Sequence, residues 1–153
     1  MELLDPLTKS MLLKMFLAAF LGAFIGIERE IAHKSAGMRT HALVALGSAL
    51  FTITPTLLSG PTIDPTRIAA QVVTGIGFLG AGIIFFDQSR SRVQGLTTAA
   101  GVWISAAIGM AVAFGLYEVS LWATLLTVLI FLVLWPIERR FIKRFAKENR
   151  DLD

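Results

Sequence analysis

The sequence predicts an all-α membrane protein, a polytopic helix bundle with about five transmembrane helices. Hydrophobic residues make up 55% of the 153 residues and charged residues 16%, whereas typical soluble domains carry about 25% charged residues. The mean hydropathy is +0.71. The charges lie in clumps, and the long uncharged runs between them hold more apolar side chains than a soluble domain of this size can bury. We therefore expect lipid to cover much of the apolar surface.

Five apolar runs are long enough to cross a bilayer, which takes roughly 20 residues with a range of about 17 to 25. They cover residues 11–27, 41–59, 68–86, 96–116 and 119–137. The first run ends in Glu28-Arg29-Glu30 and not in a small-residue cleavage site, so we interpret it as a retained helix and not as a signal peptide. The glycine-rich third run is expected to be the central, most enclosed helix. The fourth and fifth runs are so closely joined that they should form a tight antiparallel hairpin.

The distribution of basic residues predicts the orientation of the chain. With five spans, eleven Lys and Arg residues fall on one side of the membrane and three on the other. Because cytoplasmic loops are enriched in Lys and Arg, the N-terminus should face outside and the C-terminus the cytoplasm. Residues 1–137 would form the transmembrane domain. Residues 138–153 would form a basic cytoplasmic juxtamembrane tail that binds anionic lipid.

Small residues recur at helical spacing within three of the runs. Lipid gives no hydrophobic drive between helices, so close contacts rely on such residues. The predicted packing positions are Gly22, Gly26, Gly75, Gly77, Gly80, Gly82, Gly101 and Gly109. For the third run, bending or the approach of a ligand is an open alternative. The ladders on the first and fourth runs also predict a homo-oligomer, most simply a homodimer, and Trp103 is expected to be a packing residue.

The sequence disfavours several classes of function. It has no cysteine and no Walker A motif or nucleophile elbow, so we expect no catalytic residue, no enzyme activity and no cofactor. Its two histidines do not make a zinc site. Mg²⁺ is possible but not derivable, and no metal site is assigned. The basic residues lie at the ends of apolar runs, so no nucleic-acid partner is expected. No Asp or Glu lies deep in a span, which disfavours a carboxylate-based ion-coupled transporter but leaves open a pore of hydroxyls and carbonyls.

The first of three polar clusters surrounds the end of the first run and the start of the second. It contains the candidate residues Glu28, Arg29, Glu30, Arg39 and His41. Carboxylates are unfavourable at the negative end of a helix, so Glu28 and Glu30 should have partners, for which the nearby cations are candidates. This cluster is either a structural network of ion pairs or a binding site for a cytoplasmic ligand or partner.

The other two clusters flank the third run. Asp64, followed by Pro65, fits a helix N-cap; alternatively it forms an outward-facing site with Arg67 and Gln71, and Thr74 in the same run is a further candidate. The third cluster covers residues 87–98. Its candidates Asp87, Thr97 and Thr98, together with two arginines, would either start a helix or receive an anion at its N-terminus.

These clusters carry a resemblance to a known family. Residues 22–30, 36–41, 64–82 and 95–100, followed by Trp103, resemble in sequence and order the motifs of the MgtC/SapB membrane proteins. The resemblance covers residues 22–117. It implies a multi-pass protein of the bacterial inner membrane. Family members support growth in low Mg²⁺ and survival in macrophages, and act on other membrane machines, including the ATP synthase and cation-transporting ATPases. Many add a soluble C-terminal domain, which we expect this chain to lack.

The resemblance and the residue patterns together lead to one functional hypothesis and one alternative. We expect a regulatory protein linked to magnesium homeostasis, to acid or low-Mg²⁺ stress and to membrane potential, acting through contacts with other membrane proteins. The alternative is a transporter or channel for Mg²⁺ or another cation. Under the first hypothesis, charges at span ends should matter more than interior residues, above all Glu28, Arg39, Asp64 and Arg67.

Overall fold

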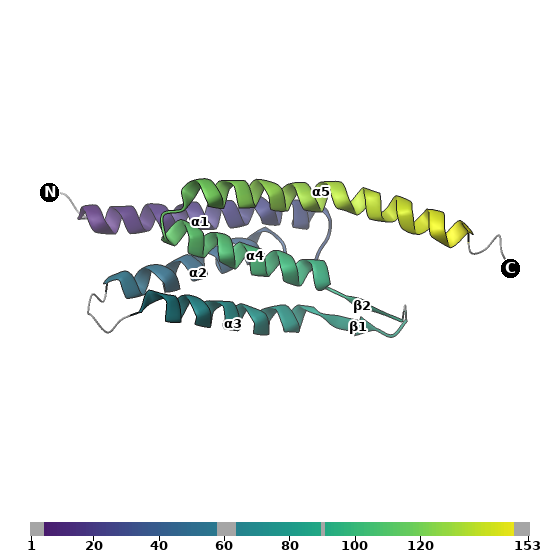
Figure 1. The fold of residues 1–153 in the computed structure, drawn as a ribbon, viewed down its shortest axis with the longest axis horizontal. Coiled ribbons are helices and arrows are strands. Elements are labelled where there is room, and N and C mark those ends of the chain that lie inside the picture. Colours follow the sequence, from purple (N-terminus) through teal and green to yellow (C-terminus); the bar gives the residue numbers. More distant parts are fainter. Residues whose placement is uncertain (1–4, 58–63, 90, 149–153) are drawn as a thin grey trace.

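The computed structural model describes residues 5–57, 64–89 and 91–148. It contains five helices that run roughly side by side along the long axis of the molecule (Figure 1). Their bounds are α1 (Pro6–Ile31), α2 (Met38–Leu57), α3 (Pro65–Ile83), α4 (Leu96–Ala113) and α5 (Tyr117–Glu148). Two short strands, β1 (Phe85–Asp87) and β2 (Arg92–Gln94), connect α3 to α4.

The described helices confirm the predicted all-α membrane bundle. Three of them are long and apolar enough to cross a membrane, namely α1, α4 and residues Tyr117–Ile137 of α5, and α3 is apolar over the shorter stretch Arg67–Ile83. Helices α2 and α3 occupy the second and third predicted runs. That these two also cross the membrane, and which end of the bundle faces the cytoplasm, remain predictions.

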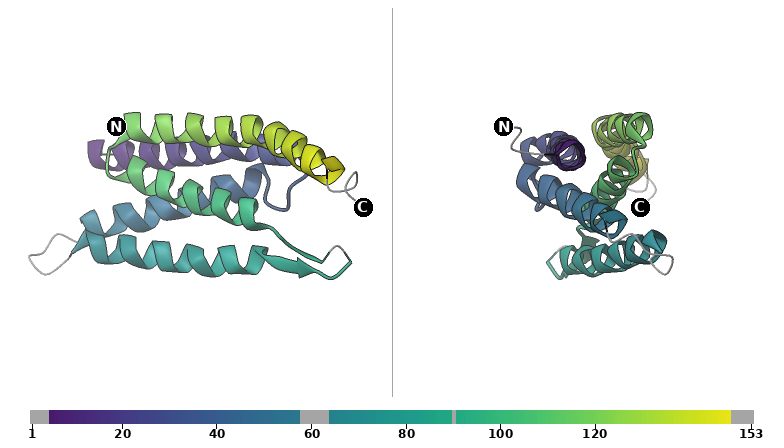
Figure 2. Two further views of the ribbon diagram at one scale, coloured as in Figure 1. Left: turned by 45° about the vertical axis from the view of Figure 1, so that its right-hand side comes forward. Right: turned by 90° about the vertical axis from the view of Figure 1, so that its left-hand side faces the viewer.

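Local sequence signals explain where the first and last helices begin and bend. Asp5 is the N-cap of α1: its carboxylate accepts a hydrogen bond from the Thr8 amide at 3.4 Å, and Pro6 takes the first helical position, where its missing N–H costs nothing. Helix α5 continues without interruption past residue 137 and contains Pro136. Figure 2 shows α5 changing direction in its C-terminal part, which is the effect of proline inside a helix.

The predicted tail lies largely outside what the structure describes. Residues 138–148 extend α5, but their side chains are outside the described part of the chain, as are residues 149–153 altogether. Binding of the tail to anionic lipid, and the division into a domain at residues 1–137 and a tail at 138–153, therefore stay predictions.

Helices α1, α2 and α4 form the packed centre of the bundle. Glycines permit this packing, because a methyl group on Gly22 would come within 2.8 Å of Ala45 Cβ, and one on Gly109 within 3.0 Å of Ala45 Cα. Around these crossings lies a buried apolar cluster to which α5 adds one aromatic ring. Its members are Ala18, Leu21, Ile25, Ala49, Ile53, Ile108, Val112, Ala113 and Phe131.

Helix α3 lies at the edge of the bundle, so the expectation that it is the most enclosed helix was wrong (Figure 1). It rests on its neighbours through Val72, Ile76 and Ile83, whereas Phe78 is 82% exposed. Its glycines make little close contact with the neighbouring helices: at three of them a methyl group would meet no atom within 4 Å, and at Gly80 it would meet Ala99 Cβ at 3.8 Å. The three open positions are Gly75, Gly77 and Gly82.

Trp103 is a second correction to the predicted packing. Its side chain is 50% exposed, because it lies on the outward side of α4, while Gly101 and Ser105 lie on the buried side. Glycine content and the position of a tryptophan within a span thus did not by themselves reveal which side of a helix faces the interior.

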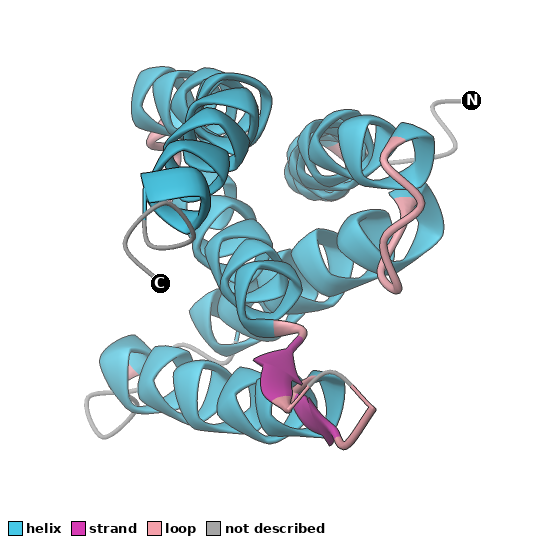
Figure 3. Cartoon of the chain, turned by 90° about the vertical axis from the view of Figure 1, so that its right-hand side faces the viewer, coloured by secondary structure: helices cyan, strands magenta, loops and turns pink. Residues whose placement is uncertain are grey.

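The connection from α3 to α4 is a β-hairpin, whose strands are magenta in Figure 3. The third run was predicted to extend through residue 86, but the helix ends at Ile83, and aromatic residues suited to a strand follow. The strands are antiparallel, with the pairs Phe85–Gln94, Phe86–Val93 and Asp87–Arg92. We call the end of the bundle where α1 and α3 end and α2 and α4 begin the basic end.

Candidate functional site at the basic end

Arg29 is a buried cation near the end of α1. Only 3% of the residue is exposed. Its Nε and Nη2 atoms both donate to the Glu28 carboxylate, the second at 2.9 Å from Oε1. The guanidinium carbon lies 3.7 Å from the centroid of the Phe131 ring on α5. A buried charge needs such partners, and an arginine over an aromatic face is attracted by the ring. Arg29 therefore connects α1 to α5.

His41 makes the corresponding connection between α2 and α4. The residue is fully buried, and its Nδ1 lies 2.8 Å from Ser105 Oγ. Ser105 donates its single hydroxyl hydrogen to the Gly101 carbonyl at 3.0 Å, so it accepts the hydrogen bond from His41. The other ring nitrogen, Nε2, makes no hydrogen bond within the described residues. Such buried, unpaired atoms are rare in native proteins.

Gly101 brings the two connections together. A methyl group at this position would lie 3.0 Å from Phe131 Cζ and 3.2 Å from His41 Cε1. The aromatic ring that covers Arg29 and the imidazole of His41 therefore meet at the same point of α4. We call the group Glu28, Arg29, His41, Ser105 and Phe131 the polar junction; it links α1, α2, α4 and α5.

Glu30 orders the turn between α1 and α2. Its Oε2 accepts a hydrogen bond from the Met38 amide at 3.0 Å, which supplies a partner for an amide at the start of α2 that has none within the helix. The negative charge also suits the positive end of the helix. A side chain at Gly37 would collide with this carboxylate. Arg39, in the first turn of α2, is exposed.

The second predicted cluster lies at the opposite end of the bundle, far from the polar junction (Figure 1). Asp64 directly precedes α3 and its carbonyl accepts from the Arg67 amide at 3.2 Å. Arg67, Gln71 and Thr74 are exposed. Gln71 lines a mostly apolar cavity of about 470 Å³ between α2 and α3, and the Thr74 hydroxyl donates to the Ala70 carbonyl at 3.2 Å.

The third predicted cluster organises the β-hairpin. One Asp87 carboxylate oxygen accepts from the Ser89 amide at 3.0 Å and from the Ser89 hydroxyl at 2.6 Å, and the other accepts from the Gln94 side-chain amide. Thr97 is exposed in the first turn of α4, while Thr98 is buried. The contacts of Asp87 are those of a turn residue.

Sequence reasoning missed three participants at the two ends of the bundle. Neither Ser105 nor Phe131 was among the candidate site residues, since no sequence pattern pairs them with His41 and Arg29. Lys14 was used only in the charge count that predicts the orientation, but its Nζ donates to the Ala113 carbonyl at 2.8 Å. It thereby binds one of the carbonyls left free at the end of α4. The sequence signal that could have indicated this contact is the position of Lys14 as a single cation inside an apolar run.

Comparison with known proteins identifies the family. The model of the MgtC family matches residues 15–140. The YhiD protein of Escherichia coli (strain K12), whose name proposes magnesium transport, is 40% identical over 145 residues, which are 90% of this chain and 66% of YhiD. The MgtC protein of Brucella abortus (strain 2308) is 47% identical over 112 residues, 73% of this chain and 46% of that protein. MgtC of Salmonella typhimurium (strain 14028s / SGSC 2262) is 46% identical over 101 residues, 66% of this chain and 42% of that protein.

These relatives are longer than the matched region, and this chain spans about two thirds of YhiD and less than half of the two MgtC proteins. No solved structure matches the chain. The family match nevertheless extends over most of the sequence and includes the whole polar junction. The chain belongs to the MgtC family.

Proposed function

We propose that this protein is a regulator of magnesium homeostasis, a multi-pass protein of the bacterial inner membrane that acts through lateral contacts with other membrane proteins. The link to magnesium comes from YhiD, whose name proposes magnesium transport. Roles in acid or low-Mg²⁺ stress and in membrane potential, with the ATP synthase or a cation-transporting ATPase as partner, belong to the same proposal.

One observation favours a regulator over a conduit: the central helices contact one another backbone to backbone. A methyl group on Gly26 would come within 2.8 Å of the Met38 amide nitrogen, and Gly22 and Gly109 meet α2 equally closely. At these crossings there is no space for a hydrated ion. Buried hydroxyls nearby are also engaged by their own helix, as when Thr52 donates to the Ser48 carbonyl at 2.8 Å.

The edge helix offers a surface for lateral contacts. Small residues allow helices in a membrane to approach closely, and Gly77 and Gly82 on α3 have open space beside them. Phe78 projects from the same helix and is largely exposed. A helix of a partner protein, or of a second copy, can therefore come close to α3 without disturbing the packed centre.

A cation transporter is the second candidate. It is favoured by the name of YhiD and by the cavity between α2 and α3, where Ser48 and Gln71 supply polar atoms to a mostly apolar lining. Under this alternative, ions would pass beside α3 and not through the packed centre, and Gln71 would be required for flux.

Two measurements on the same protein separate the candidates. In liposomes that contain a Mg²⁺-sensitive dye, the regulator should give no protein-dependent uptake, while crosslinking in native membranes followed by mass spectrometry should identify one dominant membrane partner. Uptake that disappears in Gln71→Leu but persists in the control Gln88→Leu, a change in the exposed hairpin turn, would establish transport and overturn the regulator.

A further inference from the structure

A cavity of about 700 Å³ lies between α1 and α5 at the basic end. Figure 3 looks along the bundle from this end and shows α1 and α5 as separate helices in the upper half of the view. The volume is in the range of small-ligand sites, about 300–1,000 Å³. Arg29 and Phe131 of the polar junction are among the residues that line it.

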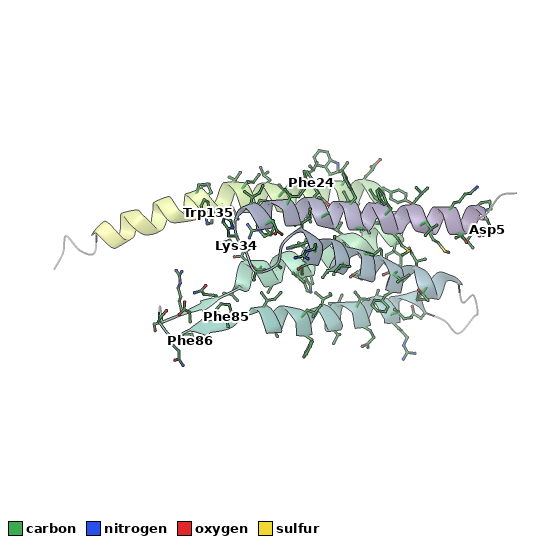
Figure 4. The ribbon with its side chains drawn as sticks, turned by 180° about the vertical axis from the view of Figure 1, so that it is seen from behind. Asp5, Phe24, Lys34, Phe85, Phe86 and Trp135 are labelled. Atoms are coloured by element: carbon green, nitrogen blue, oxygen red, sulfur yellow. The ribbon has the colours of Figure 1, made fainter. Side chains whose placement is uncertain are left out.

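The lining of this cavity changes character along the bundle axis. Toward the middle of the helices it is apolar, with Phe24 and Ile27 from α1 and Val128 and Leu132 from α5. Toward the basic end it is polar, and Lys34 lies in the turn after α1. Figure 4 shows Phe24, Lys34 and Trp135, three of the residues that line the cavity, on their separate elements.

The polar part of the lining carries a net positive charge. Arg29 and Glu28 form an ion pair, so their charges compensate each other. Lys34 is exposed, and within the described residues no salt bridge of its side chain is formed. Glu28 is the sole carboxylate among the described residues that line the cavity. The complementary ligand has a long apolar part and an anionic end.

We propose that this cavity binds one anionic phospholipid, with an acyl chain between α1 and α5 and the headgroup phosphate at Lys34. Basic pockets between transmembrane helices are suited to anionic headgroups. Trp135 at the cavity is half exposed, and tryptophan favours the level of the headgroups, which puts Lys34 at the right depth. The inference does not depend on the proposed role in magnesium homeostasis.

Native mass spectrometry of the purified full chain in detergent tests the headgroup contact. The protein should retain phosphatidylglycerol in preference to phosphatidylcholine, and Lys34→Gln should weaken phosphatidylglycerol binding roughly fivefold, the effect of one cation near an anionic lipid. Arg92→Gln removes one positive charge at the same end, on β2, outside the cavity, and should leave binding unchanged. Equal effects of the two substitutions, or no preference between the lipids, would overturn the proposal.

A second pair of variants tests the acyl-chain contact. Leu132 lines the cavity and is 57% exposed, whereas Leu129 on the same helix is 54% exposed and is not part of the lining. Leu132→Trp should fill the cavity and remove the retained lipid, while Leu129→Trp should not, provided that all variants elute and unfold like the parent. Two results would show that no acyl chain is bound there: the Leu132→Trp variant retains the lipid, or excess glycerol phosphate displaces the lipid from the parent protein.

Discussion

Arg29 and His41 are the two ionisable side chains that the described bundle buries most completely, and both use their partners to join helices. Glu28 is next to Arg29 in the sequence, but the other two partners are distant. Phe131 is about 100 residues from Arg29, and Ser105 is 64 residues from His41. Each buried polar group therefore keeps its partner only when two helices pack correctly. A wrong arrangement of these helices would leave Arg29 or His41 buried without its partner, which is unfavourable.

Replacing Arg29 tests this burial. Arg29→Gln leaves the Glu28 carboxylate without its cation and removes the contact with Phe131, so we expect a loss of about 3–5 kcal/mol in the free energy of unfolding, as for other broken buried pairs. Arg39→Gln, an exposed arginine in the next helix, should change it by less than about 0.5 kcal/mol. Reversible denaturation in mixed micelles measures both, and similar losses would mean that Arg29 is not effectively buried.

Replacing Ser105 tests the second connection. Ser105→Ala removes the hydrogen-bond partner of His41 Nδ1, and an unpaired buried group costs about 1–3 kcal/mol. Thr54→Ala is the control, because the exposed Thr54 hydroxyl donates to the Leu50 carbonyl of its own helix. The thermal midpoint in detergent should fall for the first variant and stay near the parent value for the second. A midpoint that is unchanged in Ser105→Ala would contradict a strong His41–Ser105 bond.

At the scale of elements, the junction between the hairpin and α4 is held by backbone geometry. Gly95, the N-cap of α4, has φ +90°, a conformation that glycine adopts readily and other residues do not. A methyl group there would also lie 3.0 Å from the Ile83 carbonyl carbon. The end of α3, the hairpin and the start of α4 thus depend on one another, whereas the candidates predicted for the hairpin and the start of α4 were Asp87, Thr97 and Thr98.

This dependence gives a paired prediction for Gly95 and for Gly82, which lies in the last turn of α3. Gly95→Ala should destabilise the protein by more than about 1 kcal/mol, since both strain and a collision oppose it. Gly82→Ala, inside α3 with nothing within 4 Å, should be neutral or stabilising by up to about 1 kcal/mol, because alanine favours helix over glycine. Chemical denaturation followed by circular dichroism measures both. Equal responses would exclude the strained turn.

At the scale of the whole molecule, the bundle has a tight centre of α1, α2 and α4 and a loosely attached edge helix. Glycines occur in both parts with different consequences: Gly109 meets the backbone of α2, while Gly77 meets open space. A sequence ladder of small residues does not distinguish these two situations. The homodimer stays a prediction.

Two leucine substitutions separate packing within the chain from packing between chains. Gly109→Leu should prevent folding, because the side chain would collide with the Ala45 backbone, and the protein should be lost from the membrane fraction. Gly77→Leu should leave the fold and expression intact. If α3 mediates self-association, Gly77→Leu should abolish the crosslinked dimer in native membranes. A dimer that persists in this variant would exclude that side of α3 as the interface.

The sequence predicted what depends on apolar length and charge, and not what depends on the register between helices. The five helices coincide with the five runs because a long apolar run favours helix in a membrane. The end of α3 was missed because Phe85 and Phe86 are as apolar as the helix before them. Glu28, Arg29 and His41 were identified as one cluster, but their partners Phe131 and Ser105 were not, because those contacts require the packing of α5 and α4.

The length of α5 has a mechanical consequence. Its 32 residues, at about 1.5 Å each, extend about 48 Å, whereas the hydrocarbon layer is about 30 Å thick. With Tyr117–Ile137 across this layer, as predicted, the last third of the helix extends beyond the hydrocarbon as a lever arm. Its pivot, Pro136, lies little more than one turn from the Phe131 ring that covers Arg29. A force on this arm, from lipid or from a bound protein, would therefore act close to Arg29, the most deeply buried cation of the described bundle.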